Sequence, residues 1–165
     1  MDANQILMGK RVLVVDDEND ILELLIDLLR ICRIDTASSF EEAKRLLESY
    51  PYDIAVLDIM GVDGFELLKI ANSRNIPALM LTAKALNEES LDKSIEEGAA
   101  YFVPKGEIAR IDTYVADVLE GIEKDKNPWV RWFKRLGGNF DVLFSGPNWR
   151  EQKKEFWEKL RKADW

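Results

Sequence analysis

The stretch VLVVDD, residues 12–17, runs four consecutive apolar residues directly into two aspartates. Two later segments repeat this arrangement: IAVL, residues 54–57, precedes Asp58, and YFV, residues 101–103, leads through a proline to Lys105. Continuous apolar runs of this length are typical of strands buried on both faces of a parallel sheet. Because the carboxyl ends of such strands meet at one edge of an open α/β sheet, we expect the three carboxylates and the lysine to lie together.

This cluster predicts a cation site. Asp16 and Asp17 repel each other and lose hydration at the end of an apolar strand, so a hard cation with oxygen ligands, most simply Mg²⁺, would stabilise them and Asp58. Lys105 would then suit an anion held on that cation. The alternative is that each aspartate caps the helix that follows its strand. That explanation serves for a single aspartate, whereas the whole set favours the cation site.

The rest of the sequence alternates between patterns typical of strands and patterns typical of helices. Runs typical of strands lie at residues 12–15, 34–37, 54–57, 78–81 and 100–103, and helical spacing of apolar residues follows each of them, at 21–29, 40–47, 65–71, 90–97 and 108–122. Ser39 followed by Glu42 is a capping-box signature, and Gly98 is a helix stop. Five such units predict an α/β protein with a doubly wound, five-stranded parallel sheet and helices on both faces.

The amino-acid composition excludes several kinds of site and binding partner. The 165 residues carry a formal net charge of −8, which argues against a general nucleic-acid binder. With no histidine, the chain cannot form a Ser-His or Cys-His pair, a histidine metal site or a phosphohistidine. The lone Cys32 cannot form an internal disulfide and fits core packing. No apolar run reaches transmembrane length and residues 1–9 lack a signal-peptide layout, so we expect a cytoplasmic location without stable membrane insertion.

Residues 10–124 resemble a response-regulator receiver domain, the phospho-accepting part of two-component signalling, with residues 1–9 as a lead-in. The segments that carry the resemblance are VLVVDDEN (12–19), VLDIMGVDGFELL (56–68), ALMLTA (78–83) and GAAYFVPK (98–105). They occur in the family's order and at the expected strand ends. The resemblance implies a flavodoxin-like fold, shared with chemotaxis regulators, and makes Asp58 the phosphoryl acceptor, forming an aspartyl phosphate.

The resemblance also implies a ligand set and a switch. Asp17 would bind Mg²⁺ directly and Asp16 through water, joined by Asp58 and the backbone carbonyl of Met60. Thr82 and Lys105 match the hydroxyl and ammonium groups that contact the phosphoryl oxygens, and Phe102 matches the aromatic switch position. The chemistry is consistent, since phosphoryl transfer needs an in-line nucleophile and neutralisation of the equatorial oxygens. Phe102 could instead be an ordinary core aromatic.

Two departures from the family pattern affect the site. Only residues 59–62 separate Asp58 from the Asp-Gly turn, a loop two residues shorter than usual, and Gly61 would allow this loop to reach the metal. Lys105 precedes Gly106, where the family usually has a proline with a cis peptide bond. Because a cis bond before a non-proline residue costs about 2.5–4 kcal/mol, we expect a trans peptide here.

Residues 125–165 form a tryptophan-rich tail that contains every tryptophan of the chain, and basic residues outnumber acidic ones within it. Asn127-Pro128 begins a predicted helix with Trp129, Trp132, Phe133 and Leu136 on one face. After a break at residues 145–147, a second, basic amphipathic helix is predicted, with Trp149, Phe156, Trp157 and Leu160 on its apolar side.

These short helices cannot bury their aromatic side chains alone. We expect them to dock on the acidic receiver body, while a homodimer or an unidentified protein target remains an alternative occupant. The tail is too small for a helix-turn-helix output domain and has no zinc ligands, which argues against specific DNA binding. Glutamates at positions 151, 155 and 158 weaken a membrane-surface interpretation.

The sequence therefore predicts a phosphorylation-dependent signalling switch and not an enzyme, with at most slow self-dephosphorylation. Its phosphoryl donor would be a sensor histidine kinase or a histidine phosphotransfer protein, and its output would run through protein contacts. One alternative is an aspartyl-nucleophile phosphatase, but Met60 stands where haloacid-dehalogenase-like enzymes have their second aspartate. The other is a phosphorylation-independent interaction module, favoured if the two departures disable the site.

Overall fold

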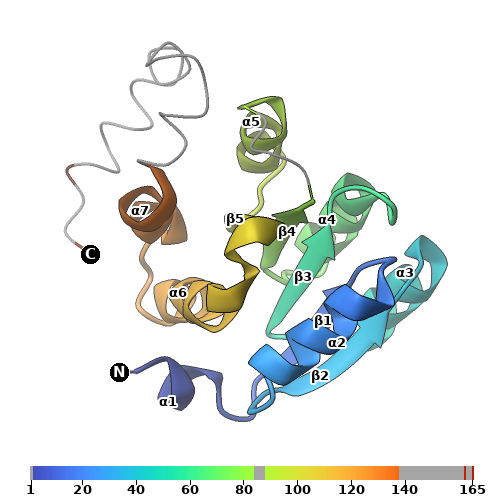
Figure 1. Ribbon diagram of the computed structural model, residues 1–165. Coiled ribbons are helices and arrows are strands. Elements are labelled where there is room, and N and C mark those ends of the chain that lie inside the picture. Colours follow the sequence, from blue (N-terminus) through green and yellow to red (C-terminus); the bar gives the residue numbers. More distant parts are fainter. Residues whose placement is uncertain (1, 84–87, 138–161, 163–164) are drawn as a thin grey trace.

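The computed structural model describes residues 2–83 and 88–137, together with residues 162 and 165. A five-stranded parallel sheet in the order β2-β1-β3-β4-β5 forms its centre (Figure 1). Every residue of the central strands β3 and β4 is buried, as expected for apolar strands covered on both faces. The strands are β1 (Arg11–Val15), β2 (Arg33–Ala37), β3 (Ile54–Asp58), β4 (Ala78–Thr82) and β5 (Tyr101–Pro104).

Helices cover both faces of this sheet. Helices α2 and α6 contact each other over one face, and α3 and α4 contact each other over the other, which confirms the doubly wound α/β fold (Figure 1). Over the described ranges, no helix has the length and apolar character that crossing a membrane requires. The helices are α1 (Ala3–Leu7), α2 (Asn19–Leu28), α3 (Phe40–Ser49), α4 (Gly64–Ser73), α5 (Glu88–Glu96), α6 (Ile111–Glu123) and α7 (Pro128–Trp132).

Capping residues and helix stops in the sequence predict most helix boundaries to within a few residues of those in the structure. The Ser39 side chain accepts a hydrogen bond from the Glu42 amide at 3.3 Å, as a helix cap should, but the Glu42 carboxylate returns to the Ser38 amide and not to that of Ser39. Gly98 ends the α5 segment with φ of +87°. Cys32 is half-buried against the core, and its thiol donates to the Leu7 carbonyl at 3.4 Å.

The amino-terminal lead-in has more structure than expected. Asp2 and Gln5 form a reciprocal capping box at the start of α1, and this helix packs against α6. Ile6 and Leu7 are buried as a result. A single turn of helix was not predicted because five residues are too few to show a helical repeat, although the spacing of Asp2 and Gln5 was a usable signal.

The tail begins with a helix that docks on the body, as predicted. Asn127 caps α7, and both Trp129 and Trp132 are buried against the β5 edge of the sheet. A π-helical turn, Phe133–Gly137, continues it. The Arg131 guanidinium lies 3.9 Å from the centroid of the Trp165 ring. The predicted break at 145–147 and the second tail helix, with Trp149, Phe156, Trp157 and Leu160, lie outside the described residues.

Candidate functional site

The predicted site residues meet at the carboxyl edge of the sheet because of the strand register. Val15 is level with Leu57, Asp58 with Leu81, and Thr82 with Pro104. Asp16 follows β1 directly and Lys105 follows β5 directly, so residues from four strands lie at one edge. Asp16, Asp58 and Thr82 are all buried there.

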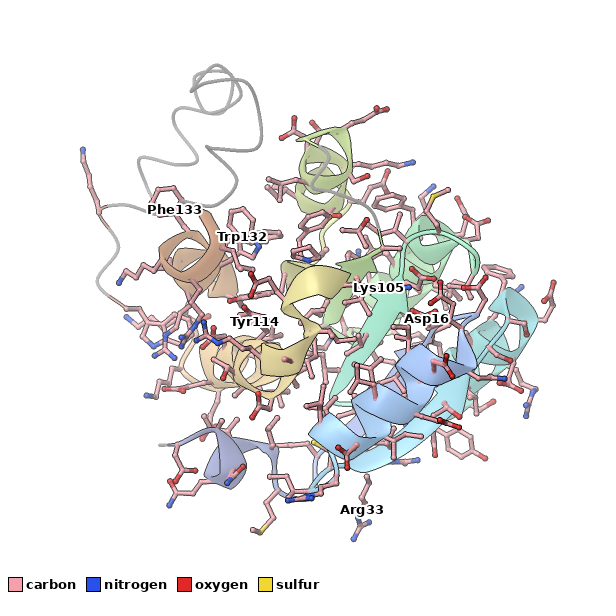
Figure 2. All side chains as sticks on the ribbon, in the orientation of Figure 1. Asp16, Arg33, Lys105, Tyr114, Trp132 and Phe133 are labelled. Atoms are coloured by element: carbon pink, nitrogen blue, oxygen red, sulfur yellow. The ribbon has the colours of Figure 1, made fainter. Side chains whose placement is uncertain are left out.

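Lys105 is the ion-pair partner of two of these aspartates. Its Nζ lies 2.8 Å from Asp16 Oδ2 and 3.6 Å from Asp58 Oδ1, and Figure 2 shows the Lys105 and Asp16 side chains close together. The Lys105 side chain is 10% exposed and the two carboxylates are almost wholly buried. One ammonium group thus faces two buried carboxylates, which leaves the cluster short of positive charge.

The pKa values of Asp58 and Lys105 are shifted by the burial and the unbalanced negative charge of this cluster. Burial, followed by the charge of Asp16, raises the pKa of Asp58 to about 7, while Lys105 acts in the opposite direction and Asp17 adds to the increase. Burial alone would lower the pKa of Lys105, but the contact with Asp16 and the charge of Asp58 outweigh it and raise that pKa. The site therefore favours a second positive charge near Asp58.

The chemistry of the donor set fits a hard divalent cation. One carboxylate oxygen from each of Asp16, Asp17 and Glu18 lies within 4.8 Å of the others. Asp16 Oδ2 and Asp58 Oδ1 are buried without a well-formed hydrogen bond within the described structure, and carboxylate oxygens of this kind are the ligands that Mg²⁺ prefers. Asp16 Oδ1 accepts the Glu18 amide at 2.9 Å, which fixes its carboxylate. Glu18 was not among the predicted site residues, although its place directly after Asp17 was a signal.

The short loop after Asp58 reaches the acidic cluster through Gly61. This residue has φ of +88°, and a Cβ added to it would lie 2.6 Å from the Asp17 carboxylate atoms. Gly64 is equally close to the strand end, because a Cβ there would lie 2.2 Å from the Asp58 carbonyl oxygen. The Met60 side chain is 67% exposed. Because glycine has no side chain, the loop backbone can approach Asp17 at Gly61 and the Asp58 backbone at Gly64.

Of the remaining predicted residues, Thr82 is 6% exposed at the end of β4, and Phe102 is fully buried within β5. The Phe102 carbonyl accepts a hydrogen bond from the Trp132 indole, a contact that no local sequence signal indicates. The peptide between Lys105 and Gly106 is trans, as expected, and a 3₁₀ helix, Lys105–Arg110, begins there.

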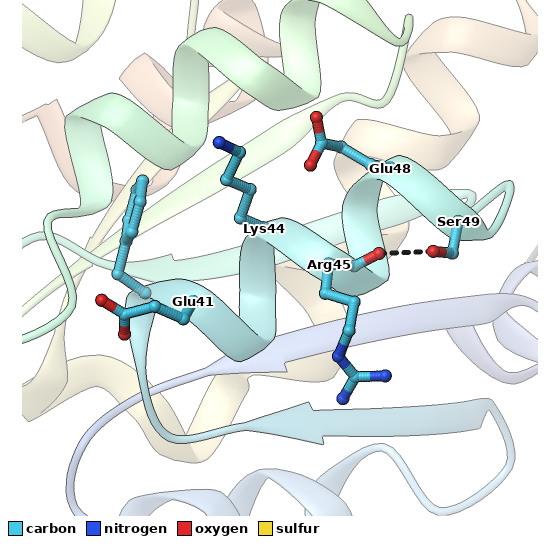
Figure 3. Close-up of a pocket in the computed structure, with 6 residues that line it drawn as sticks. Glu41, Lys44, Arg45, Glu48 and Ser49 are labelled. Carbon is cyan, nitrogen blue, oxygen red and sulfur yellow. Dashed lines mark hydrogen bonds between the residues drawn. The ribbon is translucent and has the colours of Figure 1, made fainter.

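A surface hollow on α3 lies apart from these residues (Figure 3). Its lining comes from one helix and mixes acidic, basic and aromatic side chains, and it includes none of the residues at the carboxyl edge. Ser49 Oγ donates to the Arg45 carbonyl at 2.6 Å, an ordinary bond within a helix end. The hollow is lined by Phe40, Glu41, Lys44, Arg45, Glu48 and Ser49.

Comparisons with known proteins agree with this geometry. A family model described as the response regulator receiver domain matches residues 12–116. The response regulator GtcR of Aneurinibacillus migulanus is 32% identical over 129 residues, which cover 72% of this chain and 53% of that protein. The heme response regulator HssR of Staphylococcus aureus strain Newman is 42% identical over 99 residues, covering 56% and 43%. The chain spans about half the length of these curated relatives.

Solved structures show the same fold. A CheY-like response regulator receiver domain protein from Methanospirillum hungatei JF-1 has a TM-score of 0.64 and 27% identity, covering 71% of this chain and 98% of that one. The response regulator DrrB of Thermotoga maritima has a TM-score of 0.61 and 26% identity, covering 73% and 55%.

Proposed function

The chain belongs to the response regulator receiver domain family, and from that membership we propose that it accepts a phosphoryl group on Asp58 and signals through the resulting change in its surface. Receiver domains act in phosphorylation-dependent two-component signalling. The observation that carries the proposal for this chain is the position of Lys105 Nζ, between the buried carboxylates of Asp16 and Asp58 at 2.8 and 3.6 Å.

The phosphoryl donor is proposed to be a sensor histidine kinase or a histidine phosphotransfer protein. Since this chain has no histidine, the phosphorylated imidazole must belong to a partner. The N–P bond of the phosphohistidine breaks as a bond forms between phosphorus and one Asp58 carboxylate oxygen, and the imidazole nitrogen regains a proton. The product is a mixed anhydride on Asp58, which hydrolysis later returns to carboxylate and inorganic phosphate.

Each site residue has a proposed task in this transfer. Asp16, Asp17, Asp58 and the Met60 carbonyl would hold Mg²⁺, which supplies positive charge for the phosphoryl oxygens when bound. Lys105 would leave Asp16 and contact a phosphoryl oxygen, and the Thr82 hydroxyl would donate to another. The low exposure of Asp58 limits the access of water to the acceptor.

The output is proposed to run through protein contacts. GtcR and HssR are response regulators about twice as long as the part that matches this chain. We therefore do not assign the targets of those proteins to this chain. We propose Phe102 as the residue that reports the state of the site, because it lies within β5 only three positions before Lys105.

Intact-mass measurement after incubation with Mg²⁺ and acetyl phosphate tests the proposal. We expect a stable addition of one phosphoryl group that requires Mg²⁺. Continuous release of inorganic phosphate from phosphoesters, without accumulation of a modified protein, would instead support a phosphatase. If the protein stays unmodified under conditions that phosphorylate a known receiver domain, the result would support a phosphorylation-independent interaction module.

A further inference from the structure

Helix α7 occupies the outer edge of the sheet through two indole hydrogen bonds. Trp129 Nε1 donates to the Ala99 carbonyl at 3.0 Å, and Trp132 Nε1 donates to the Phe102 carbonyl at 2.7 Å. Phe102 belongs to β5, the edge strand of the sheet, and Ala99 lies two residues before that strand, so the indoles satisfy backbone acceptors at this edge and just before it. Helix α7 is therefore attached to the backbone of β5 and of the residues that lead into it.

A buried carboxylate on α6 fixes the same helix electrostatically. Asp117 is 1% exposed and accepts hydrogen bonds from Arg135 Nε at 2.6 Å and Nη2 at 3.1 Å, and from Arg131 Nη1 at 3.2 Å. It also accepts from the Tyr101 hydroxyl of β5 at 3.0 Å. Burying a carboxylate without such partners is costly, so the charge of Asp117 on α6 is stabilised by Arg131 of α7 and by Arg135 of the π-helical turn.

The strand that seats α7 also ends in the lysine of the acceptor site. Phe102, whose carbonyl holds Trp132, is followed by Val103, Pro104 and then Lys105. Lys105 Nζ lies 2.8 Å from Asp16 Oδ2 and 3.6 Å from Asp58 Oδ1, so a phosphoryl group on Asp58 would attract this ammonium away from Asp16 and pull on the end of β5 that carries it.

We propose that α7 with its π-helical turn is an intramolecular latch, seated while Asp58 is unmodified and loosened when Asp58 carries a phosphoryl group. This inference rests on the proposed function. Displacement of Lys105 towards Asp58 moves the β5 carbonyls and Tyr101 relative to Trp132 and Arg135, and the latch loses hydrogen-bond geometry at both anchors. The edge of β5 and the adjoining surface of α6 then become accessible to a protein target.

Hydrogen exchange of the full chain tests the latch. Peptides that span residues 127–137 would be followed with Mg²⁺ alone and with Mg²⁺ plus acetyl phosphate, while intact mass is measured on the same samples. We expect exchange of the α7 amides to rise by about fivefold or more on phosphorylation, because allosteric couplings are typically of that size or larger. The Asp58→Asn variant should show no such increase.

The outcomes separate the two proposals. Absence of the mass increase removes the proposed function, and the latch falls with it. A full mass increase with unchanged or slower exchange at α7 overturns the latch and leaves the proposed function standing.

Linkage supplies a second, reciprocal test. If phosphorylation loosens α7, then loosening α7 must raise the affinity of the site for beryllofluoride, a phosphoryl mimic, by up to the same factor. Arg135→Gln removes the paired hydrogen bonds to Asp117, and Trp132→Phe removes one indole donor while keeping an aromatic ring. We expect up to about fivefold tighter beryllofluoride binding in the presence of Mg²⁺ for each variant.

Arg33→Gln is the matched control for the arginine change, because Arg33 is exposed on β2 at the opposite edge of the sheet (Figure 2). Its beryllofluoride affinity should equal that of the unmodified sequence. Equal affinity in Arg135→Gln and Trp132→Phe, with both variants folded, would contradict the latch.

Discussion

Asp58 is a nearly buried carboxylate whose charged neighbours are two further aspartates and one lysine. Burial and the negative charge of Asp16 both make its ionised form less favourable, so an added cation stabilises the whole group. The loop after Asp58 also affects cation binding. Its Gly61 lies directly against the Asp17 carboxylate, where a side chain would displace that carboxylate.

Replacing Gly61 by alanine should weaken Mg²⁺ binding. The new Cβ would push the Asp17 carboxylate aside, and a φ of +88° is strained for any residue with a side chain. We expect a loss of several-fold in Mg²⁺ affinity by titration calorimetry, with a destabilisation of about 1–3 kcal/mol. Gly106→Ala is the control, because a Cβ placed there would have no atom within 4 Å other than those of Gly106 and its chain neighbours. Equal losses in the two variants would show that Gly61 has no particular role.

Asp17→Asn should reduce Mg²⁺ affinity more strongly, because it removes a charged oxygen ligand from the cluster. The matched variant Asp20→Asn changes an exposed aspartate of α2 and should bind Mg²⁺ normally. Calorimetric titration with Mg²⁺ measures both. Unchanged binding in Asp17→Asn would exclude this residue from the cation site.

The strand pattern predicted Asp16, Asp17, Asp58 and Lys105 as one cluster because each follows a strand in the same sheet, whereas Thr82 was predicted only from the family resemblance. It did not predict the buried Asp117, which pairs with Arg131 of α7 and with Arg135 of the π-helical turn, a long-range pairing that no helical repeat reveals. Ile122, the last apolar residue of the repeat predicted at 108–122, is 53% exposed. The neighbouring Gly121 faces the returning chain at Lys126 and Pro128.

At the scale of elements, α6 is buried along most of its length because α1, α2 and α7 surround it. Asp117 at its middle joins α6 to the segment of α7 through Arg131 and Arg135, and to β5 through Tyr101. The Tyr101 ring stacks on the Trp129 ring at a centroid distance of 6.3 Å. One carboxylate and one aromatic pair thus connect three elements.

Asp117→Asn should weaken the attachment of α7. The change leaves the shape of the side chain intact but removes the charge that both arginines share, and hydrogen bonds to charged groups contribute about 1.5–3 kcal/mol. We expect a loss of stability of about that size in urea denaturation, with a red shift of tryptophan emission as Trp129 and Trp132 become hydrated. Asp27→Asn, at an exposed position of α2, should change neither quantity. An unaltered emission spectrum in Asp117→Asn would contradict this role.

On the scale of the whole molecule, the body from β1 to α6 carries the candidate acceptor site and α7 covers its β5 edge. The doubly wound sheet was predictable because β1, β3, β4 and β5 are largely apolar runs and the helix that follows each strand has its own repeat. The sequence predicted that the first tail helix docks on the body but not where. Its position depends on the backbone carbonyls of Ala99 and Phe102, which the sequence pattern does not distinguish.

A chain shortened to residues 1–124 should be less stable but still active as an acceptor. Removing α7 exposes apolar surface near Tyr101 and leaves Asp117 without its arginines, so the melting temperature should fall by several degrees. Circular dichroism measures the melting temperature and intact mass measures phosphorylation. An unchanged melting temperature would show that α7 contributes no net stability to the body.

The most direct test of the central claim is to locate the phosphoryl group. Protein incubated with Mg²⁺ and acetyl phosphate would be reduced with borohydride, which converts an aspartyl phosphate to homoserine, and then digested for peptide mass spectrometry. Homoserine at position 58, absent from protein that was not phosphorylated and from Asp58→Asn, is the predicted result. Homoserine at another aspartate, or none at all in protein that carries the added phosphoryl mass, would contradict the assignment of Asp58 as the acceptor.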